Sequence, residues 1–176
     1  MIISVASGKG GTGKTTISTN LALSLDEHIK LLDCDVEEPN AHLFIKPRIE
    51  KKETVYTFVP EIDQEKCNGC KKCAEICRFN ALTVIGKKVM VFPELCHSCG
   101  GCLEICPRKA LTSGRRELGK MEKGNANSIP FVRGVLRIGE AMSPPMIKHI
   151  RNQKVGTEIT LIDAPPGTSC PVIRAI

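Results

Sequence analysis

The chain has 176 residues, of which 41% are hydrophobic and 25% charged, a composition typical of a soluble globular protein. Its net charge of +6 is mild and only 3% of its residues are aromatic, so we expect no nucleic-acid partner. No apolar run approaches the roughly 20 residues of a membrane span, and the N-terminus lacks signal-peptide features, so we expect a cytoplasmic protein without a membrane partner.

The first part of the chain has a β–loop–α–β pattern. Ile2–Ser7 and Ile29–Asp33 are short apolar runs followed by Gly or Asp, as in buried parallel strands. Between them, Lys14–Leu25 is predicted to form a helix, since its apolar residues recur at helical spacing. These apolar residues are Ile17, Leu21 and Leu25. A third apolar run, Glu158–Asp163, predicts another parallel strand near the other end of the chain.

A phosphate-binding motif lies between the first strand and the helix. Gly8–Thr15 reads GKGGTGKT, a full match to G-x4-G-K-[ST]. Glycines allow backbone N–H groups to turn toward phosphate oxygens, and the helix N-terminus adds positive potential. We expect Lys14 to reach the β- and γ-phosphates of ATP, and the Thr15 hydroxyl to hold Mg²⁺. The expected nucleotide-binding residues of this segment are Gly8, Lys9, Gly10, Gly11, Thr12, Gly13, Lys14, Thr15 and Thr16.

The chain has 10 cysteines, and most of them fall in an internal repeat. Cys67–Thr83 (CNGCKKCAEICRFNALT) matches Cys96–Thr112 (CHSCGGCLEICPRKALT) at an offset of 29 residues. Each copy has the spacing C-x2-C-x2-C-x3-C, and this region resembles the bacterial two-cluster ferredoxins. In that arrangement three close thiolates surround one [4Fe–4S] cluster and the fourth cysteine reaches the other cluster. The expected ligand sets are Cys67, Cys70, Cys73 and Cys106 for one cluster, and Cys96, Cys99, Cys102 and Cys77 for the other.

Two zinc sites are the alternative reading of this repeat. Zinc sites usually pair two C-x2-C arms across a long gap, which differs from four cysteines within eleven positions, so we favour clusters. His97 lies between two expected ligands and is interpreted as a bystander. The first copy has Arg78 where the second has Pro107, and the charge of Arg78 is expected to affect the potential of the nearby cluster.

The sequence after the repeat returns to strand and helix patterns. Arg115–Lys120 and Ile129–Ile138 are predicted strands around a polar turn at Gly124–Asn127. Pro145–Asn152 is a predicted helix, because proline suits the first helical turn. We therefore expect an α/β fold with a P-loop parallel sheet formed by residues 1–59 and 113–176, interrupted by an α+β ferredoxin-like two-cluster module at residues 60–112.

The sequence KGGTGKT resembles the deviant phosphate loop of the MinD/ParA class of ATPases, which includes the nitrogenase iron protein and Mrp-like proteins. The resemblance implies that ATP brings two chains together and that Lys9 crosses to the partner's phosphates. Asp33-Cys34-Asp35 resembles the first switch of that family, where Asp35 would position or activate the attacking water. Lys9, Lys14 and Asp35 are the implied catalytic residues of a Mg²⁺-dependent ATPase.

The segment Asp163–Gly167 resembles the second switch of the same family. There, Asp163 would bind Mg²⁺ through water, and Gly167 would sense the γ-phosphate. The family's domain normally continues past this switch, so we expect either a fragment or a partner that covers an exposed apolar edge at Ile2–Ser7. Cys34 and Cys170 lie outside the repeat and are interpreted as small buried thiols rather than ligands.

Three functions are compatible with these patterns. The first is an ATPase whose nucleotide state controls electron transfer through two [4Fe–4S] clusters to a redox partner of unknown identity. The second is a carrier or scaffold that delivers clusters to apo-proteins, although eight saturating ligands are more typical of retained clusters. The third, a positioning protein like MinD or ParA, requires a membrane-binding helix or a DNA-binding surface, and the sequence indicates neither.

Overall fold

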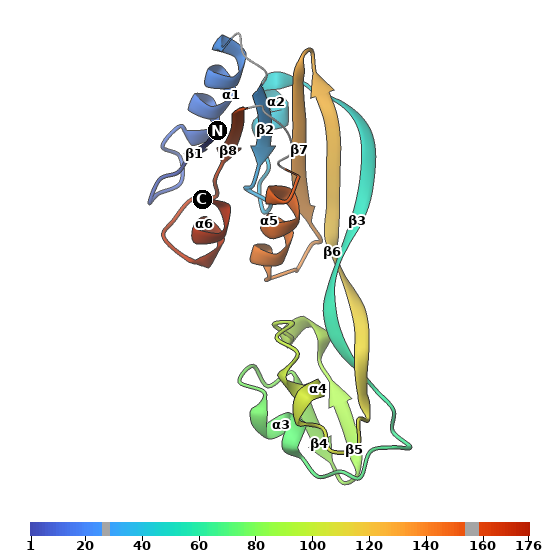
Figure 1. Ribbon diagram of the computed structural model, residues 1–176. Helices are drawn as coiled ribbons and strands as arrows, with labels where there is room; N and C mark the ends of the chain where they lie inside the picture. The colour runs from blue at the N-terminus through green and yellow to red at the C-terminus, as the bar shows by residue number, and fades with distance from the viewer. Residues whose placement is uncertain (26–28, 154–158) are drawn as a thin grey trace. The chain divides into compact units, whose positions relative to one another are not determined.

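The computed structural model describes residues 1–25, 29–153 and 159–176, which form two compact units (Figure 1). The sheet unit comprises Met1–Val55 and Leu118–Ile176, and the cysteine unit comprises Tyr56–Glu117. The expected insert, residues 60–112, falls within the cysteine unit. Glu158, the predicted first residue of a strand, lies outside the described residues.

A mixed sheet with the order β1-β8-β2-β7-β6-β3 forms the centre of the sheet unit. Its strands are β1 (Ile2–Val5), β8 (Ile159–Asp163), β2 (Ile29–Asp33), β7 (Ile129–Leu136), β6 (Leu111–Ala126) and β3 (Arg48–Ile62). The first four in this order are parallel, and β6 runs antiparallel to β7. The register aligns Val5 and Asp33 with Asp163, so the carboxyl ends of three parallel strands meet at one edge.

Helices cover both faces of the sheet, which explains why its central strands are mostly apolar. α1 (Lys14–Ser24) and α2 (Ala41–Ile45) pack on one face, and α5 (Ser143–Arg151) and α6 (Cys170–Ala175) pack on the other. Because consecutive strand residues point to opposite faces, neighbouring residues enter different cores. Leu31, Phe131 and Leu161 pack on the α1 and α2 side, whereas Leu32, Val132 and Ile162 pack on the α5 and α6 side.

The strand β1 lies at the edge of the sheet, as the sequence led us to expect, but it is not buried. Ile2 is 45% exposed, because in the described residues β1 pairs on one side only, with β8. The apolar residues of α1 do not mark its buried side, because Ile17 is 57% exposed. The buried side of α1 consists of Lys14, Ser18, Thr19 and Ala22, since the helix faces the sheet beside the phosphate loop.

The first strand after the repeat is longer than predicted, whereas the second, β7, ends at Leu136 instead of Ile138. β6 extends over Leu111–Ala126, so the turn predicted at Gly124–Asn127 begins too early, and the chain reverses at residues 127–128. Cross-strand contacts explain the extension, because Glu122 of β6 pairs with Arg133 of β7 at 2.6 and 2.7 Å. A Cβ at Gly134 would lie 2.6 Å from Ile150, so this glycine allows α5 to approach β7 closely.

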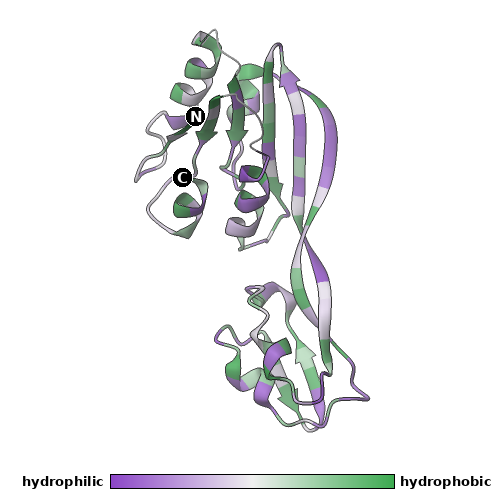
Figure 2. Cartoon of the chain, in the orientation of Figure 1, coloured by the Kyte–Doolittle hydropathy of each residue, from purple (hydrophilic) through white to green (hydrophobic). Residues whose placement is uncertain are grey.

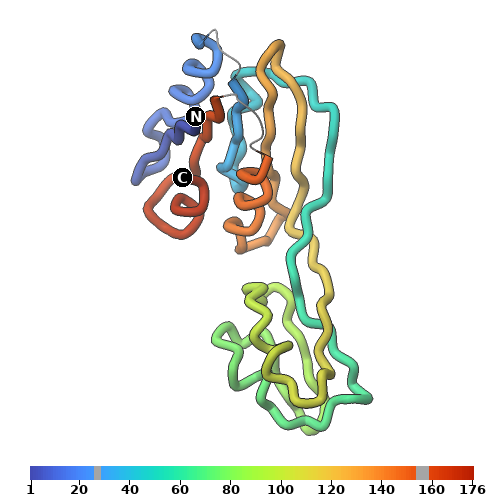
Figure 3. Tube along the Cα trace, in the orientation of Figure 1, coloured from blue at the N-terminus to red at the C-terminus, as the bar shows by residue number. Residues whose placement is uncertain are grey.

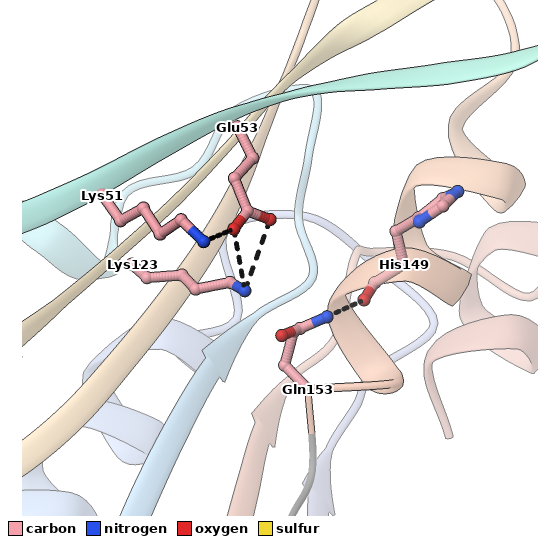
Figure 4. Close-up of polar contacts among 5 residues, drawn as sticks. All are labelled: Lys51, Glu53, Lys123, His149 and Gln153. Carbon is pink, nitrogen blue, oxygen red and sulfur yellow. Dashed lines mark hydrogen bonds and ion pairs between the residues drawn. The ribbon is translucent and has the colours of Figure 1, made fainter.

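The other edge strand, β3, was not predicted and is rich in charged residues (Figure 2). Lys51 contacts Glu53 at 2.5 Å, and Lys123 of the neighbouring strand β6 contacts the same carboxylate at 3.4 Å (Figure 4). Figure 4 also shows Gln153 donating to the backbone carbonyl of His149 at the end of α5. Charged side chains on an edge strand discourage pairing with other chains.

The cysteine unit contains two short helices and a hairpin. The helices are α3 (Lys72–Ile76) and α4 (Gly101–Ile105), and the hairpin joins β4 (Leu82–Ile85) to β5 (Lys88–Val91), followed by the 3-10 turn η1 (Pro93–Leu95). The helices occupy equivalent places in the two copies, because each begins at the second residue after the second cysteine. Figure 3 traces the chain entering this unit along β3 and leaving it along the neighbouring strand β6. Across the described residues, no helix combines the length and apolarity that crossing a membrane requires.

Candidate functional site

The loop between β1 and α1 has the backbone that the phosphate motif predicts. Gly11 and Gly13 have φ values of 70° and 87°, which favour glycine, and Gly13 caps α1. A Cβ at Gly10, Gly11 or Gly13 would meet nothing within 4 Å, so the side of the loop next to the helix N-terminus is open. The Ser7 hydroxyl donates to the Lys9 carbonyl at 2.8 Å and lies 2.7 Å from the Thr12 hydroxyl, which braces the loop.

A cavity of about 370 Å³ lies over this loop. It brings together the predicted residues Lys14, Thr15 and Asp35, although Asp35 is far from the loop in sequence. Lys14 is only 8% exposed, so its ammonium group approaches the cavity from a mostly dry environment. The lining consists of Gly10, Gly11, Gly13, Lys14, Thr15, Thr16, Asp35, Glu38, Asn40, Phe44 and Pro166. Gly8, Lys9, Thr12, Asp163 and Gly167 are not part of this lining.

Asp163 lies buried at the end of β8, directly behind the phosphate loop. Ser18 of α1 donates a 3.1 Å hydrogen bond to its Oδ1. Burial raises the pKa of Asp163, whereas the Thr15 and Ser18 hydroxyls and the Lys14 charge lower it. Its Oδ2 is buried and has no hydrogen-bond partner among the described residues. A free carboxylate oxygen beside a phosphate loop is a suitable ligand, direct or through water, for Mg²⁺.

Asp33 holds the segment after β2 in place. It is fully buried and lies opposite Asp163 in the register of β2 and β8. The backbone N–H of Asp35 donates to its Oδ1 at 3.2 Å, and that of Ala41 donates to its Oδ2 at 3.1 Å. Burial, followed by the charge of Asp163, raises the pKa of Asp33 to about 8. Asp33 therefore positions this loop, a role that the sequence motif did not reveal.

Asp35 is one of the two acidic residues of this segment that line the cavity, and the other is Glu38. Burial raises the pKa of Asp35 to about 6, with a further contribution from Asp163, while the backbone N–H of Glu38 and the Lys14 charge act in the opposite direction. A carboxylate with this pKa is mostly ionised at neutral pH and is still basic enough to accept a proton.

The segment after β8 is tied to the phosphate loop by its backbone. The N–H of Gly167 donates to the Ser7 carbonyl at 3.0 Å, and the N–H of Ala164 donates to the Val5 carbonyl at 3.1 Å. Gly167 has a φ of 104°, which glycine adopts without strain. The side chain of Lys9 is exposed, and in the described part of the chain it makes no ion pair.

Four contributors to this site were missed from the sequence. Ser18 was missed although it lies one helical turn after Lys14, on the side of α1 that faces Asp163. Glu38, Asn40 and Phe44 line the cavity from the segment that follows β2. The proximity of this segment to Asp35 was the available signal, but the short helix α2 has too few turns for its pattern to be recognised.

The first cysteine site is a narrow cavity in the cysteine unit. Its lining contains all four cysteines of the first predicted set: Cys67, Cys70, Cys73 and Cys106. Burial raises the pKa of Cys73, and the charges of Cys106 and Cys67 add to the effect, as expected for thiols that lie together. The N–H groups of Gly69 and Ala110 point at Cys67 Sγ (3.4 Å) and Cys106 Sγ (3.3 Å).

The second cysteine site is a wider cavity lined by the other predicted set, which is Cys96, Cys99, Cys102 and Cys77. Burial, followed by the charges of Cys96, Cys99 and Cys77, raises the pKa of Cys102 to about 11. The N–H of Ser98 points at Cys96 Sγ at 3.4 Å. His97 stacks on Phe79 with ring centroids 3.6 Å apart, so its ring is engaged outside the ligand set.

These two cavities test whether the residues fit the predicted clusters. Each cavity collects three cysteines from one copy of the repeat and the fourth from the other copy, in the crossed pattern of two-cluster ferredoxins. Among the residues described, no group of three or more His, Cys, Asp or Glu side chains is arranged to hold a metal ion. The second cavity measures about 260 Å³ and the first about 20 Å³. Four thiols in each lining are the donor set that a [4Fe–4S] cluster takes.

The two cysteines outside the repeat differ from each other. Cys34 is fully buried between strands, and burial raises the pKa of its thiol, as expected for a structural residue. Cys170 is exposed, so the interpretation of this residue as a buried thiol is wrong. It is the first residue of α6, and the buried residues of that helix are Val172 and Ala175.

The α/β fold and the phosphate loop define a nucleotide-binding domain of the P-loop class. Residues 3–164 match the model of the CobQ/CobB/MinD/ParA nucleotide binding domain, and the chain belongs to this family. It is 41% identical over 181 aligned residues to Uncharacterized protein MJ0578 of Methanocaldococcus jannaschii, an alignment that covers the whole chain and 63% of that relative.

Two further comparisons cover a part of the chain or its fold. The chain is 50% identical over 46 residues to Uncharacterized ATP-binding protein MJ0547 of the same organism, which is 24% of this chain and 17% of that protein. The septum site-determining protein MinD of Pyrococcus horikoshii, solved in complex with Mg-ADP, aligns with a TM-score of 0.49 and 17% identity, covering 99% of this chain and 52% of that one. The chain thus spans less than two thirds of the length of the relatives that it matches along its whole length.

Proposed function

We propose that the chain is part of an ATP-binding iron–sulfur protein in which the nucleotide state of the sheet unit controls electron transfer through two [4Fe–4S] clusters in the cysteine unit. The observation that carries this proposal is the pair of cavities, each lined by a crossed set of four cysteines. The same chain holds a family-typical nucleotide cavity. The name of the relative MJ0547 supports ATP as the nucleotide.

The nucleotide cavity contains the groups that phosphoryl transfer needs. Lys14 and the N–H groups at the start of α1 would bind the phosphates, because both offer positive potential to anions. Thr15 and the unpartnered oxygen of Asp163 would hold Mg²⁺. Asp35 would orient the attacking water and accept its proton while the bond from the γ-phosphorus to the leaving oxygen breaks. Lys9 would contact the phosphates of a second chain in an ATP-dependent homodimer.

The cysteine unit offers each cluster both protection and access. When bound, a [4Fe–4S] cluster accepts and releases one electron at a time. Cys73, Cys96 and Cys102 are buried, whereas Cys70 and Cys99 are exposed, so each set keeps one thiol at the surface. Backbone N–H groups directed at Sγ atoms would stabilise thiolate charge and raise the reduction potential.

A short stretch of chain connects the nucleotide cavity to the cysteine unit. Asp35 and Asn40 line the cavity, α2 follows at Ala41–Ile45, and β3 begins at Arg48 and continues into the cysteine unit. A nucleotide that moves the segment from Asp35 to Asn40 would thus move residues bonded through α2 to β3. This connection supports coupling between nucleotide state and the environment of the clusters.

An anaerobic redox titration tests the proposal. Reconstituted protein should contain about eight iron atoms per chain, and its cluster potentials should shift when a non-hydrolysable ATP analogue is added with Mg²⁺. Lys14→Ala should abolish the shift because it removes the phosphate contact, whereas Lys120→Ala, which changes an exposed lysine outside the cavity lining, should leave it intact. Zinc in place of iron would refute the cluster assignment, and identical potentials with and without nucleotide would refute the coupling.

Cluster delivery is the alternative that a transfer assay separates. Loaded protein is mixed with an apo-ferredoxin acceptor in the presence of an iron chelator. Retention of iron by this chain supports electron transfer, as expected from the buried thiols, whereas movement of iron to the acceptor would support a carrier instead.

A further inference from the structure

The two cysteine cavities differ in the charge of their surroundings. Three cations, Lys71, Lys72 and Arg108, line the first cavity, and none of its described lining residues is acidic. All three are exposed, and within the described chain none of them makes an ion pair. The second cavity has no Lys, Arg, Asp or Glu in its lining. Both linings contain four cysteines, so the difference in charge comes from the other lining residues.

Equivalent positions of the repeat make the contrast sharper. Lys71 and Lys72 of the first copy correspond to Gly100 and Gly101 of the second. Across the repeat, Arg108 beside the first cavity corresponds to Phe79 beside the second, where Phe79 stacks on His97. The first cavity is therefore rimmed by cations and the second by small and aromatic side chains.

The backbone of Lys71 is unfavourable for lysine. Lys71 has a φ of 65° and Gly100 has a φ of 77°, so the fold requires the left-handed conformation at this position. Glycine adopts this conformation without strain, as it does in the second copy. The first copy therefore places a cation beside the exposed Cys70 at a position where the second copy has glycine.

We propose that the rim of the first cavity is the docking site of an acidic electron-transfer protein. We name this rim, formed by Asn68, Cys70, Lys71, Lys72 and Arg108, the basic mouth. Cys70 is the exposed thiol of the first set, so a partner held by the three cations would meet the cluster through this ligand. An unpaired cationic rim attracts a partner with an acidic surface and accelerates its association. This inference rests on the proposed function, because it requires a cluster behind Cys70.

A protein partner fits the basic mouth better than a nucleic acid does. Single-stranded nucleic acids are usually held by a basic groove together with aromatic side chains that stack on bases. Phe58 and Phe79 line the second cavity, whereas no Phe, Tyr or Trp is among the lining residues that the first cavity shares with the three cations. Electron transfer also requires a partner that carries a redox centre.

The test measures electron transfer from the reduced, cluster-loaded protein to two probe proteins of opposite charge, an acidic flavodoxin and a basic cytochrome c. Lys71→Gln/Lys72→Gln removes two charges from the basic mouth. The matched control, Lys120→Gln/Lys148→Gln, removes two charges from exposed residues of the sheet unit. At low ionic strength, the first variant should react with flavodoxin about tenfold more slowly than the wild type, because two attractive charges are lost. The control variant should retain the wild-type rate, and the cytochrome c rate should not fall in either variant.

The outcomes separate this inference from the proposed function. Iron content is measured first, and a wild-type protein that binds no clusters would overturn both. With clusters loaded, an unchanged flavodoxin rate in the Lys71→Gln/Lys72→Gln variant, or an equal loss in the control, would overturn the docking site alone. An oligonucleotide that binds the wild type but not this variant, together with an unchanged flavodoxin rate, would assign the surface to nucleic acid and also refute the proposal.

Discussion

Replacement of Asp33 by asparagine should change how the stability of the sheet unit depends on pH. Asp33 is fully buried, and burial together with the charge of Asp163 raises its pKa from 3.8 to about 8. The folded protein therefore keeps a proton at pH 7 that the unfolded chain releases. A carboxyl group with a raised folded-state pKa makes the protein less stable as pH rises between these two values. Asparagine cannot ionise, so the stability of the variant does not fall with rising pH on account of this residue.

The size of the effect follows from the pKa difference. Each pH unit between 3.8 and 8 lowers the free energy of unfolding by about 1.4 kcal/mol. Relative to a pH below 3.8, this residue therefore lowers the stability of the wild type by roughly 4 kcal/mol at pH 7 and by roughly 2 kcal/mol at pH 5. Asparagine has one acceptor oxygen, so one of the backbone N–H groups of Asp35 and Ala41 loses its partner, at a cost of about 2 kcal/mol. The variant should therefore be more stable than the wild type by about 2 kcal/mol at pH 7 and about equal to it at pH 5.

Urea unfolding at pH 5, 6 and 7, followed by circular dichroism without nucleotide or Mg²⁺, measures this difference. Asp63→Asn is the matched control, because Asp63 is exposed and the neighbouring Lys66 lowers the pKa of its carboxyl group. A lowered pKa gives no pH dependence between pH 5 and 7. A stability difference between Asp33→Asn and the wild type that stays constant over this range would refute the account of Asp33 as a buried, protonated carboxyl group.

Two further predictions concern the sites themselves. Cys106→Ala should remove the cluster of the first copy and Cys77→Ala that of the second, because each cavity takes its fourth thiol from the other copy; iron analysis and electron paramagnetic resonance of both variants measure this, and loss of the cluster of the residue's own copy would contradict the crossed assignment. ATP hydrolysis should fall about tenfold per pH unit below pH 6, because Asp35, with a pKa of about 6, must be ionised to accept a proton; Asp35→Asn should abolish most of the rate, and an unchanged profile in that variant would assign the titration to another group.

The sequence predicted the parts of the molecule that short motifs and apolar runs define. The strands β2 and β8, the helix α1 and the phosphate loop lie within a few residues of their predicted bounds, because glycine, proline and aspartate mark their ends. The crossed grouping of the cysteines was expected from their ferredoxin-like spacing, and each cavity lining includes one of the two predicted sets.

The parts that were missed depend on contacts between distant residues. β3 was not recognised, because an edge strand rich in lysine and glutamate has little apolar alternation. β6 was predicted too short, since its Glu122 is buried only through pairing with Arg133 and Lys52. The apolar residues of α1 predicted the wrong buried side. The side that is buried carries Lys14 and Ser18, which belong to the nucleotide site, and Ser18 donates to Asp163. The position of Asp33 opposite Asp163 could not be predicted either, because it depends on the order of the strands in the sheet.

The place of β8 between β1 and β2 has a consequence for biosynthesis. Neither of the two early strands can complete its pairing until Ile159–Asp163 has left the ribosome. Residues 56–117 are continuous, so the whole cysteine unit emerges while its host sheet is still open. At 5–20 residues per second, translation from Glu117 to Asp163 takes roughly 2 to 9 seconds, an interval in which all residues of the cysteine unit precede the last strand of the sheet.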